Sequence, residues 1–144
     1  MRTILLVEDN PDDVLLTKRA FEKSNVLNTV VVAEDGEQAL DCLLGRGDYQ
    51  GKPVKPELIL LDLKMPKMGG LEVLKRLQQD ARLSLIPVIV LTTSTEEEDL
   101  VKSYHYGANS FIRKPVDFKQ FVDAVKQLEL YWMVLNKSPQ NSNV

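Results

Sequence analysis

Five polar residues in this sequence stand where a short apolar or strand-like run ends. Glu8 and Asp9 follow the first run, Asp62 follows a run of four large apolar residues, and Thr92 and Lys114 follow two later runs. Loop starts are commonly polar, which explains any one of these positions but explains less easily three acids, a hydroxyl and a lysine together. If the runs are parallel strands of one sheet, all five side chains meet at its carboxyl edge, where such sheets bind ligands.

Carboxylates gathered at one edge repel one another. A like-charged pair about 4 Å apart costs roughly 4 kcal/mol at an effective dielectric constant of ~20, and a divalent cation relieves that cost. Oxygen ligands without histidine or cysteine favour a hard ion, Mg²⁺ rather than Zn²⁺. Because Mg²⁺ in proteins is commonly shared with phosphate oxygens, the cluster predicts a site for a metal and a phosphoryl group together.

The remaining side chains suit that chemistry. Lys114 can pair with a phosphoryl oxygen as a point charge, and Thr92 can donate a hydroxyl hydrogen bond to another. Asp62 is left as the nucleophile, since carboxylates can form aspartyl-phosphate intermediates. Met65-Pro66 and Gly69-Gly70 mark a turn directly after Asp62, which places this acid at the end of its strand.

Strand-like and helix-like segments alternate five times along the chain. Strands are expected at residues 2–7, 29–33, 58–61, 88–91 and 110–113, and helices after Asn10, Asp35, Gly70, Ser94 and Asp117. The alternation predicts an α/β fold, a doubly wound parallel sheet in the flavodoxin-like order 2-1-3-4-5 with helices on both faces. Residues 45–57 are expected to form an exposed loop, and the last helix to continue to about Leu135.

Composition narrows the class of protein. The 144 residues, 44% of them hydrophobic, suit one domain over residues 1–137 with a frayed polar tail at 138–144. The net charge of −3 argues against nucleic acid as a direct partner. Cys42 is the only cysteine and is expected to be a small buried residue. No apolar run reaches the length of a membrane span and no signal peptide is seen, so the cytoplasm is the expected location.

The combination of Glu8-Asp9, Asp62, Thr92 and Lys114-Pro115 on five strand–helix units resembles the receiver domain of two-component response regulators. The likeness covers roughly residues 2–130. It implies that Asp62 is phosphorylated by the phosphohistidine of a sensor histidine kinase, and that the chain assists this Mg²⁺-dependent reaction without acting on a separate substrate.

The resemblance also implies the metal ligands. Asp9 would bind Mg²⁺ directly, Glu8 directly or through water, and Asp62 would share the ion. The backbone carbonyl of Lys64 would complete the protein ligands.

A further implication of the resemblance is a conformational switch. Thr92 and Phe111 would be the switch pair, the hydroxyl moving to the phosphoryl group and the ring turning inward behind it. Lys114-Pro115 is the position of a cis peptide in this family. The changed surface would comprise the fourth helix, the fifth strand and the fifth helix.

A narrower likeness concerns three segments. The helix start at Asn10–Asp13, the long loop at Gly45–Glu57 and the extension with Tyr131-Trp132 are similar to small receiver-only regulators paired with bacterial phytochromes, especially cyanobacterial ones.

The segment Leu130–Leu135 is apolar all round, which a helix resting on one sheet cannot bury. We therefore expect a homodimer surface and an unknown downstream protein as partners. The expected interface residues are Tyr104, Tyr131, Trp132 and Leu135.

Several purely structural interpretations and several competing functions stay open at this point. Asp12 and Asp13 are expected to be first-turn helix acids, and His105 a surface histidine. An aspartyl-phosphate phosphatase or phosphomutase commonly needs a second acid two residues after the nucleophile, where this chain has Lys64. A flavodoxin-like electron carrier needs a Ser/Thr/Gly-rich phosphate loop where Glu8–Pro11 stands. A receiver that acts without phosphorylation, as an interaction module, is the third alternative.

Overall fold

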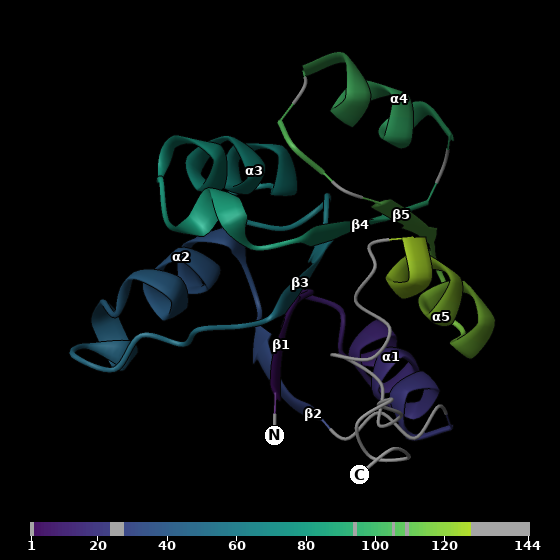
Figure 1. The fold of residues 1–144 in the computed structure, drawn as a ribbon, viewed down its shortest axis with the longest axis horizontal. Coiled ribbons are helices and arrows are strands. Elements are labelled where there is room, and N and C mark those ends of the chain that lie inside the picture. The colour runs from purple at the N-terminus through teal and green to yellow at the C-terminus, as the bar shows by residue number, and fades with distance from the viewer. Residues whose placement is uncertain (1, 24–27, 94, 105, 109, 128–144) are drawn as a thin grey trace, which may run out of the picture.

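The computed structural model describes residues 2–23, 28–93, 95–104, 106–108 and 110–127. It contains a five-stranded parallel sheet in the order β2-β1-β3-β4-β5, with helices on both faces (Figure 1). The strands are β1 (Arg2–Val7), β2 (Asn28–Ala33), β3 (Leu58–Asp62), β4 (Val88–Thr92) and β5 (Ser110–Arg113). The helices are α1 (Pro11–Lys23), α2 (Gly36–Leu44), α3 (Gly70–Gln79), α4 (Thr95–Tyr104) and α5 (Phe118–Gln127). The predicted strand order and alternation are confirmed.

The central strands are apolar throughout because both of their faces are covered. All residues of β3 and β4 are buried. Successive side chains of a strand point to opposite faces, so Ile59 and Leu61 pack on the side of α2 and α3, while Leu58 and Leu60 pack on the side of α1 and α5. On the second side, the rings of Phe21 and Phe121 lie 4.6 Å apart between their centroids. The sheet is thereby fixed between two apolar layers.

Side-chain caps begin two of the helices where the sequence predicts. The Asn10 Oδ1 atom accepts hydrogen bonds from the backbone N–H of Asp12 and of Asp13, at 2.8 and 3.2 Å. Asp35 Oδ1 accepts from the Gln38 N–H at 2.8 Å. Each cap satisfies donors that the first turn of a helix leaves unpaired, and so fixes how the chain leaves β1 and β2.

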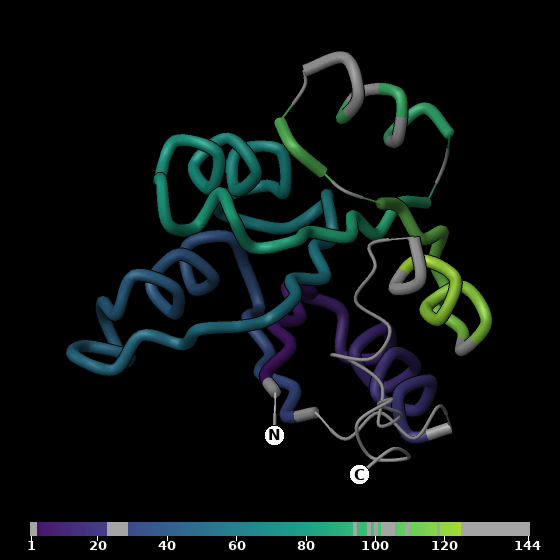
Figure 2. The backbone as a smooth tube through the Cα atoms, viewed as in Figure 1, coloured from purple at the N-terminus to yellow at the C-terminus, as the bar shows by residue number. Residues whose placement is uncertain are grey.

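The connection from α2 to β3 is the segment that was expected to form an exposed loop. Figure 2 shows it turning at the end of α2 and running back along that helix to β3. It contains a short 3₁₀ helix, Gly47–Tyr49. Val54 donates its N–H to the Cys42 carbonyl at 2.9 Å and packs against the core, as Tyr49 does. Pro56 is buried. The prediction of an exposed loop therefore holds for most of this segment, with Tyr49, Val54 and Pro56 as the residues that pack inward. Cys42 itself is buried, as expected.

The chain's last predicted features lie outside the described residues. Helix α5 is described to Gln127, and its expected continuation to Leu135, with Tyr131 and Trp132, falls beyond it, as does the tail at 138–144. His105 is also outside the described residues, and Tyr104 ends α4. Within the described part of the chain, no helix has the length and apolar character needed to cross a membrane.

Candidate functional site

The three predicted acids lie together at the carboxyl edge of the sheet. β1 and β3 are neighbours with Val7 opposite Leu61, so Glu8 and Asp62 come next to each other as the two strands end. One carboxylate oxygen from each of Glu8, Asp9 and Asp62 lies within 4.8 Å of the others. Glu8 and Asp62 are buried, with 1% and 4% of their surface exposed, whereas Asp9 is exposed. The carboxylates of Glu8 and Asp62 are therefore largely desolvated.

Lys114 extends from the end of β5 into this acidic cluster. Its Nζ atom lies 2.9 Å from Glu8 Oε1, 2.9 Å from Asp13 Oδ2 and 3.4 Å from Asp62 Oδ1. Its backbone N–H donates to the Thr92 carbonyl at 2.8 Å, which ties the ends of β4 and β5 together. The predicted cis peptide at Lys114-Pro115 is present. Thr92 ends β4 and is buried.

Asp13 is the residue of this cluster that sequence reasoning missed. It was expected to be only a first-turn helix acid, but its carboxylate also forms an ion pair with Lys114. A signal was available: side chains of a helix lean toward its N-terminus, and Asp13 lies in the first turn of the helix that follows Glu8-Asp9. An acid there points back toward the sheet edge.

The donor set fits a hard divalent cation. All three cluster residues offer carboxylate oxygens, which Mg²⁺ and Mn²⁺ accept. In an octahedral Mg²⁺ site with bonds of about 2.1 Å, ligand oxygens stand about 3.0 Å apart when adjacent and about 4.2 Å apart when opposite. The observed spacing, within 4.8 Å, needs only a small inward movement of the side chains. Lys64, whose carbonyl was predicted to join them, directly follows Leu63 in the loop after β3, and its side chain is exposed.

Burial sets the electrostatics of the cluster. It raises the pKa of Glu8 to about 7; the hydrogen bond from Lys114 opposes this rise and the charge of Asp62 adds to it. Burial likewise raises the pKa of Asp62, against the charge of Lys114. For Lys114, burial lowers the pKa, but hydrogen bonds to Asp13 and Glu8 outweigh it, so that the pKa rises above its ordinary value. The lysine therefore stays charged and partly neutralises the acids.

A measurable consequence is that Glu8 destabilises the metal-free fold at neutral pH. Between its unfolded pKa near 4.5 and its folded pKa of about 7, the folded state binds more protons, so stability falls as the pH rises through this window. The cost is on the order of 3 kcal/mol. Glu8→Gln should flatten this dependence and raise the melting temperature at pH 8 by about 3 °C or more, measured by circular dichroism in chelator between pH 4.5 and 8. The exposed Glu22→Gln is the control, and a Glu8→Gln profile that parallels wild type would contradict the assignment.

The connection from β4 to α4 is held by side chains. Both the backbone N–H and the hydroxyl of Thr93 donate to Glu97 Oε2, the former at 2.9 Å. Burial acts to raise the pKa of Glu97, but the bonds from Thr93 and the charge of Lys64 lower it overall. Ser94, after which the fourth helix was expected to begin, lies outside the described residues. Arg113 Nη2 donates to Thr95 Oγ1 at 2.9 Å, joining β5 to the start of α4.

Close backbone packing holds the opposite side of the site, after β3. A Cβ atom built on Gly70 would lie 2.5 Å from the Asp62 carbonyl oxygen and 2.7 Å from Leu63 Cα. One built on Gly36 would meet the Met68 carbonyl and lie 2.8 Å from Val73 Cγ2. Helices α2 and α3 thus approach the loop after Asp62 so closely that only glycine fits at these two positions.

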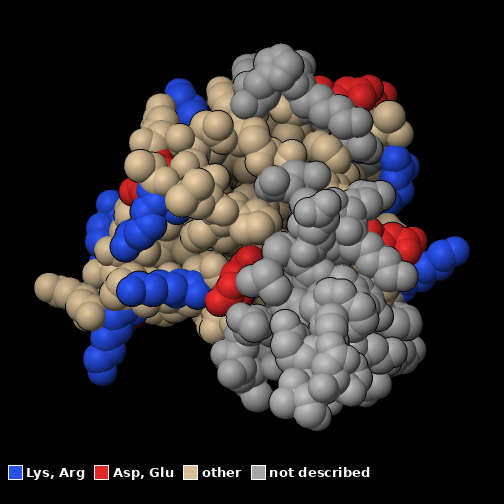
Figure 3. Space-filling model, viewed as in Figure 1, with Lys and Arg blue, Asp and Glu red and all other residues tan. Residues whose placement is uncertain are grey.

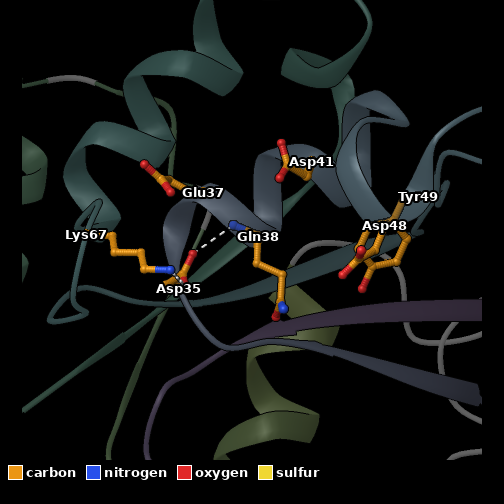
Figure 4. Close-up of a pocket in the computed structure, with 7 residues that line it drawn as sticks. All are labelled: Asp35, Glu37, Gln38, Asp41, Asp48, Tyr49 and Lys67. Carbon is orange, nitrogen blue, oxygen red and sulfur yellow. Dashed lines mark hydrogen bonds and ion pairs between the residues drawn. The ribbon is translucent and has the colours of Figure 1, made fainter.

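A separate pocket of about 170 Å³ lies beside α2 and the 3₁₀ helix (Figure 4). Lys67, which has a positive φ of 64°, places its amine 3.6 Å from Asp35 Oδ2 there. The pocket is lined by Asp35, Glu37, Gln38, Asp41, Asp48, Tyr49 and Lys67. It shares no residue with the acidic cluster at the sheet edge, and its acids are not among those predicted to do chemistry.

Phe111 lies on β5 and is partly buried against the core on the side of α2 and α3. Among the described residues, Figure 3 shows Lys and Arg side chains along the left side and at the right edge of the view, with Asp and Glu side chains between them. The predicted site residues that the structure brings together are thus Glu8, Asp9, Asp62 and Lys114, with Thr92 tied to Lys114 through the backbone.

Comparisons with known proteins agree with this geometry. The family described as the response regulator receiver domain matches residues 4–126. The probable methanogenesis regulatory protein FilR2 of Methanothrix harundinacea is 41% identical over 136 residues, covering 94% of this chain and 86% of that protein. Response regulator Rcp1 of Synechocystis is 37% identical over 132 residues, covering 92% and 89%.

Solved structures show the same likeness. The bacteriophytochrome response regulator AtBRR superposes with a TM-score of 0.87 at 51% identity, covering 95% of this chain and 99% of that one. The Mn²⁺-bound form of Rcp1 superposes with a TM-score of 0.74 at 36% identity, covering 92% and 94%.

Proposed function

This chain belongs to the response regulator receiver family, and from that premise we propose that Asp62 is its phosphoacceptor, receiving the phosphoryl group of a sensor histidine kinase. The observation that carries the proposal is the position of Asp62: it is buried at the end of the central strand, 3.4 Å from a lysine ammonium and beside two further carboxylates. The matching receiver family and the similarity to Rcp1 and AtBRR do not favour the phosphatase, phosphomutase and electron-carrier alternatives.

In the transfer step, one Asp62 oxygen attacks phosphorus. The new O–P bond forms as the N–P bond to the kinase histidine breaks, and the leaving imidazole keeps the bonding pair and takes up a proton. Lys114 neutralises charge on one phosphoryl oxygen, and the Thr92 hydroxyl donates to another. Phe111 then turns inward behind Thr92. Hydrolysis of the acyl phosphate by water restores the carboxylate and ends the signal.

Mg²⁺ is the proposed cofactor, and when bound it would neutralise charge shared between the carboxylates and the phosphoryl oxygens. Its ligands would be Glu8, Asp9, Asp62 and the carbonyl of Lys64. The similarity to a receiver with a Mn²⁺-bound form supports this assignment.

Metal binding should be visible as thermal stabilisation. A ligand that binds only the folded state at 100 times its Kd adds about 2.7 kcal/mol. Saturating Mg²⁺ should therefore raise the melting temperature of the wild type at pH 8 by several degrees. Asp9→Asn should lose most of that rise, whereas Asp12→Asn, which changes an exposed acid of the next turn, should keep it. Equal Mg²⁺ shifts in wild type and Asp9→Asn would show that Asp9 is not a ligand.

The similarity to the bacteriophytochrome response regulator AtBRR favours a phytochrome as the kinase. Phosphotransfer profiling tests the whole proposal: each autophosphorylated sensor kinase of the source organism is mixed briefly with the protein and Mg²⁺. We expect fast transfer from a phytochrome kinase. Transfer from a different sensor kinase would keep the phosphoacceptor role and reject the phytochrome pairing. No transfer from any kinase or small phosphodonor would reject both.

The proposed output is a change at the surface made by α4, β5 and α5. Thr92 and Phe111 link the site to β4 and β5, and the Thr95–Arg113 hydrogen bond continues the link to α4. We further propose a homodimer through this surface, with Tyr104, Tyr131, Trp132 and Leu135 in the interface. Sedimentation of wild type and of Tyr131→Ala/Trp132→Ala, with and without a phosphoryl mimic, tests it. A wild type that stays monomeric in both states at high micromolar concentration would reject the dimer.

A further inference from the structure

We propose that Asp13 is a positioning residue for phosphoryl transfer, holding the ammonium of Lys114 so that one of its N–H bonds is directed at the phosphoryl group on Asp62. The inference rests on the phosphoacceptor role proposed above for Asp62 and deepens it. It adds to the site a residue on a different element, the first turn of α1, whose only expected role was helix-start electrostatics.

The distances around Lys114 distinguish two kinds of contact. Its Nζ atom stands 2.9 Å from both Glu8 Oε1 and Asp13 Oδ2, within charge-assisted hydrogen-bond range. Asp62 Oδ1 is farther away, at 3.4 Å. A lysine ammonium has three N–H donors. Asp13 and Glu8 are its two close ion-pair partners, so a donor remains for a phosphoryl oxygen on Asp62, which would shorten that longer contact.

The position of Asp13 is itself fixed by the sequence. Asn10 accepts the backbone N–H of Asp13 at 3.2 Å and that of Asp12 at 2.8 Å, so the first turn of α1 is capped directly after the metal-site acids. From there the Asp13 side chain reaches the lysine that comes from β5, the edge strand farthest along the sheet from β2. Asp13 thereby connects α1 to the end of β5 across the site.

Burial explains why this acid suits the task. The side chains of Glu8 and Asp62 are 1% and 5% exposed, that of Lys114 is 13% exposed, and that of Asp13 is 27% exposed. Asp13 therefore keeps contact with water and carries its charge at less desolvation cost than the two buried acids. Asp13 can keep its ion pair with Lys114 throughout the reaction, while Glu8 and Asp62 would also bind the metal and Asp62 would carry the phosphoryl group.

A positioned ammonium matters because transfer depends on geometry. Without Asp13, Lys114 would be shared between Glu8 and Asp62, and its flexible four-carbon stem could move toward Glu8 and away from the reacting oxygen. A displacement on the order of 1 Å in such a group can lower a rate up to ~100-fold. We expect Asp13→Ala to lower the maximal phosphorylation rate at least about fivefold, and Asp13→Asn, which keeps a hydrogen-bond acceptor, to recover much of that loss.

The test measures phosphorylation of the full chain by a small acyl phosphate at saturating Mg²⁺, so that weaker metal binding does not enter. The maximal rate and the half-saturating donor concentration are determined for wild type, Asp13→Ala, Asp13→Asn and Asp12→Ala. Asp12 is the matched control because it is an acid of the same helix turn, and within the described residues it makes no ion pair with Lys114. A second readout, independent of phosphorylation, is the ¹⁵N–¹H correlation of the Lys114 ammonium, which is observable when its protons are held in hydrogen bonds and is assigned with Lys114→Arg.

Support requires a lower maximal rate and a weakened ammonium correlation in Asp13→Ala alone, with Asp13→Asn near wild type. An Asp13→Ala protein labelled at the wild-type rate would overturn the inference and leave the phosphoacceptor role of Asp62 intact. Equal losses of the phosphorylation rate in Asp13→Ala and Asp12→Ala would also overturn it, since the loss would then come from removing any acidic residue in the first turn of α1. If even the wild type is not labelled, the proposed function fails instead, and an ammonium correlation unchanged by Asp13→Ala would overturn the positioning role separately.

Discussion

Replacing Asp62 with asparagine is expected to abolish phosphorylation of this protein. The carboxamide has the shape of the carboxylate but lacks the anionic oxygen that forms an acyl phosphate. The neighbouring acids should not substitute, because Glu8 is paired with Lys114 at 2.9 Å and Asp9 is exposed to water. With Mg²⁺ and an acyl phosphate or a phosphorylated kinase, the wild type should carry a label that alkali and hydroxylamine remove. Asp62→Asn should carry none above background.

The variant should remain folded, which separates loss of chemistry from loss of structure. Asparagine removes a buried charge from a cluster in which burial already disfavours that charge, so the melting temperature should not fall. Asp41→Asn, a change in the separate pocket beside α2, is the control and should be labelled like wild type. Label that survives in Asp62→Asn at the wild-type level would show that another residue accepts the phosphoryl group.

Gly70→Ala is expected to be strongly destabilising and to impair phosphorylation as well. The added methyl carbon would lie 2.5 Å from the carbonyl oxygen of Asp62 and 2.7 Å from Leu63 Cα. Both are backbone atoms and cannot turn aside, so α3 or the end of β3 must move. Overpacking of this kind costs typically about 1–3 kcal/mol and occasionally more. Because the displaced backbone carries Asp62, the proposed phosphoacceptor, the labelling rate should fall together with the unfolding free energy measured in urea.

The neighbouring glycine provides a matched control. A Cβ atom on Gly69 meets only the Leu63 carbonyl, at 3.4 Å, which is ordinary contact, and its φ of −74° is open to any residue. Gly69→Ala should therefore lose no more than the small cost of a poorer helix cap, about 1 kcal/mol or less. If Gly70→Ala and Gly69→Ala are equally stable and equally labelled, the close approach of α3 to β3 does not constrain the site.

The sheet was predictable because each central strand is a continuous apolar run with a polar residue directly after it. Leu58–Leu61 can be buried on both faces only in a covered parallel sheet, and Asp62 then has to lie at the carboxyl edge. Glu8 and Lys114 follow by the same reasoning once the strand order is known. These site residues were therefore predictable from one rule, that a polar residue directly after a buried parallel strand lies at the carboxyl edge of the sheet.

The features that were not predicted depend on where individual side chains point, which the order of residues in the sequence does not specify. An acid at position 13 is expected at a helix start whether or not its side chain contacts Lys114, so the sequence does not reveal that ion pair. Glu97 satisfies a capping interpretation, and its contact with Thr93 could not be read from that pattern. Val54 is a single apolar residue between prolines and a lysine, too little to show that its segment packs against α2.

The two sides of the site are held by different kinds of contact, and this difference has a practical use. After β3, glycines at 36 and 70 bring backbone against backbone. After β4, the chain is held by side-chain hydrogen bonds, Thr93 to Glu97 and Arg113 to Thr95, which can exchange partners at little cost. A fluorophore meant to report phosphorylation therefore belongs on the exposed start of α4, whereas one on the outer face of α2 would serve as an internal reference in the same molecule.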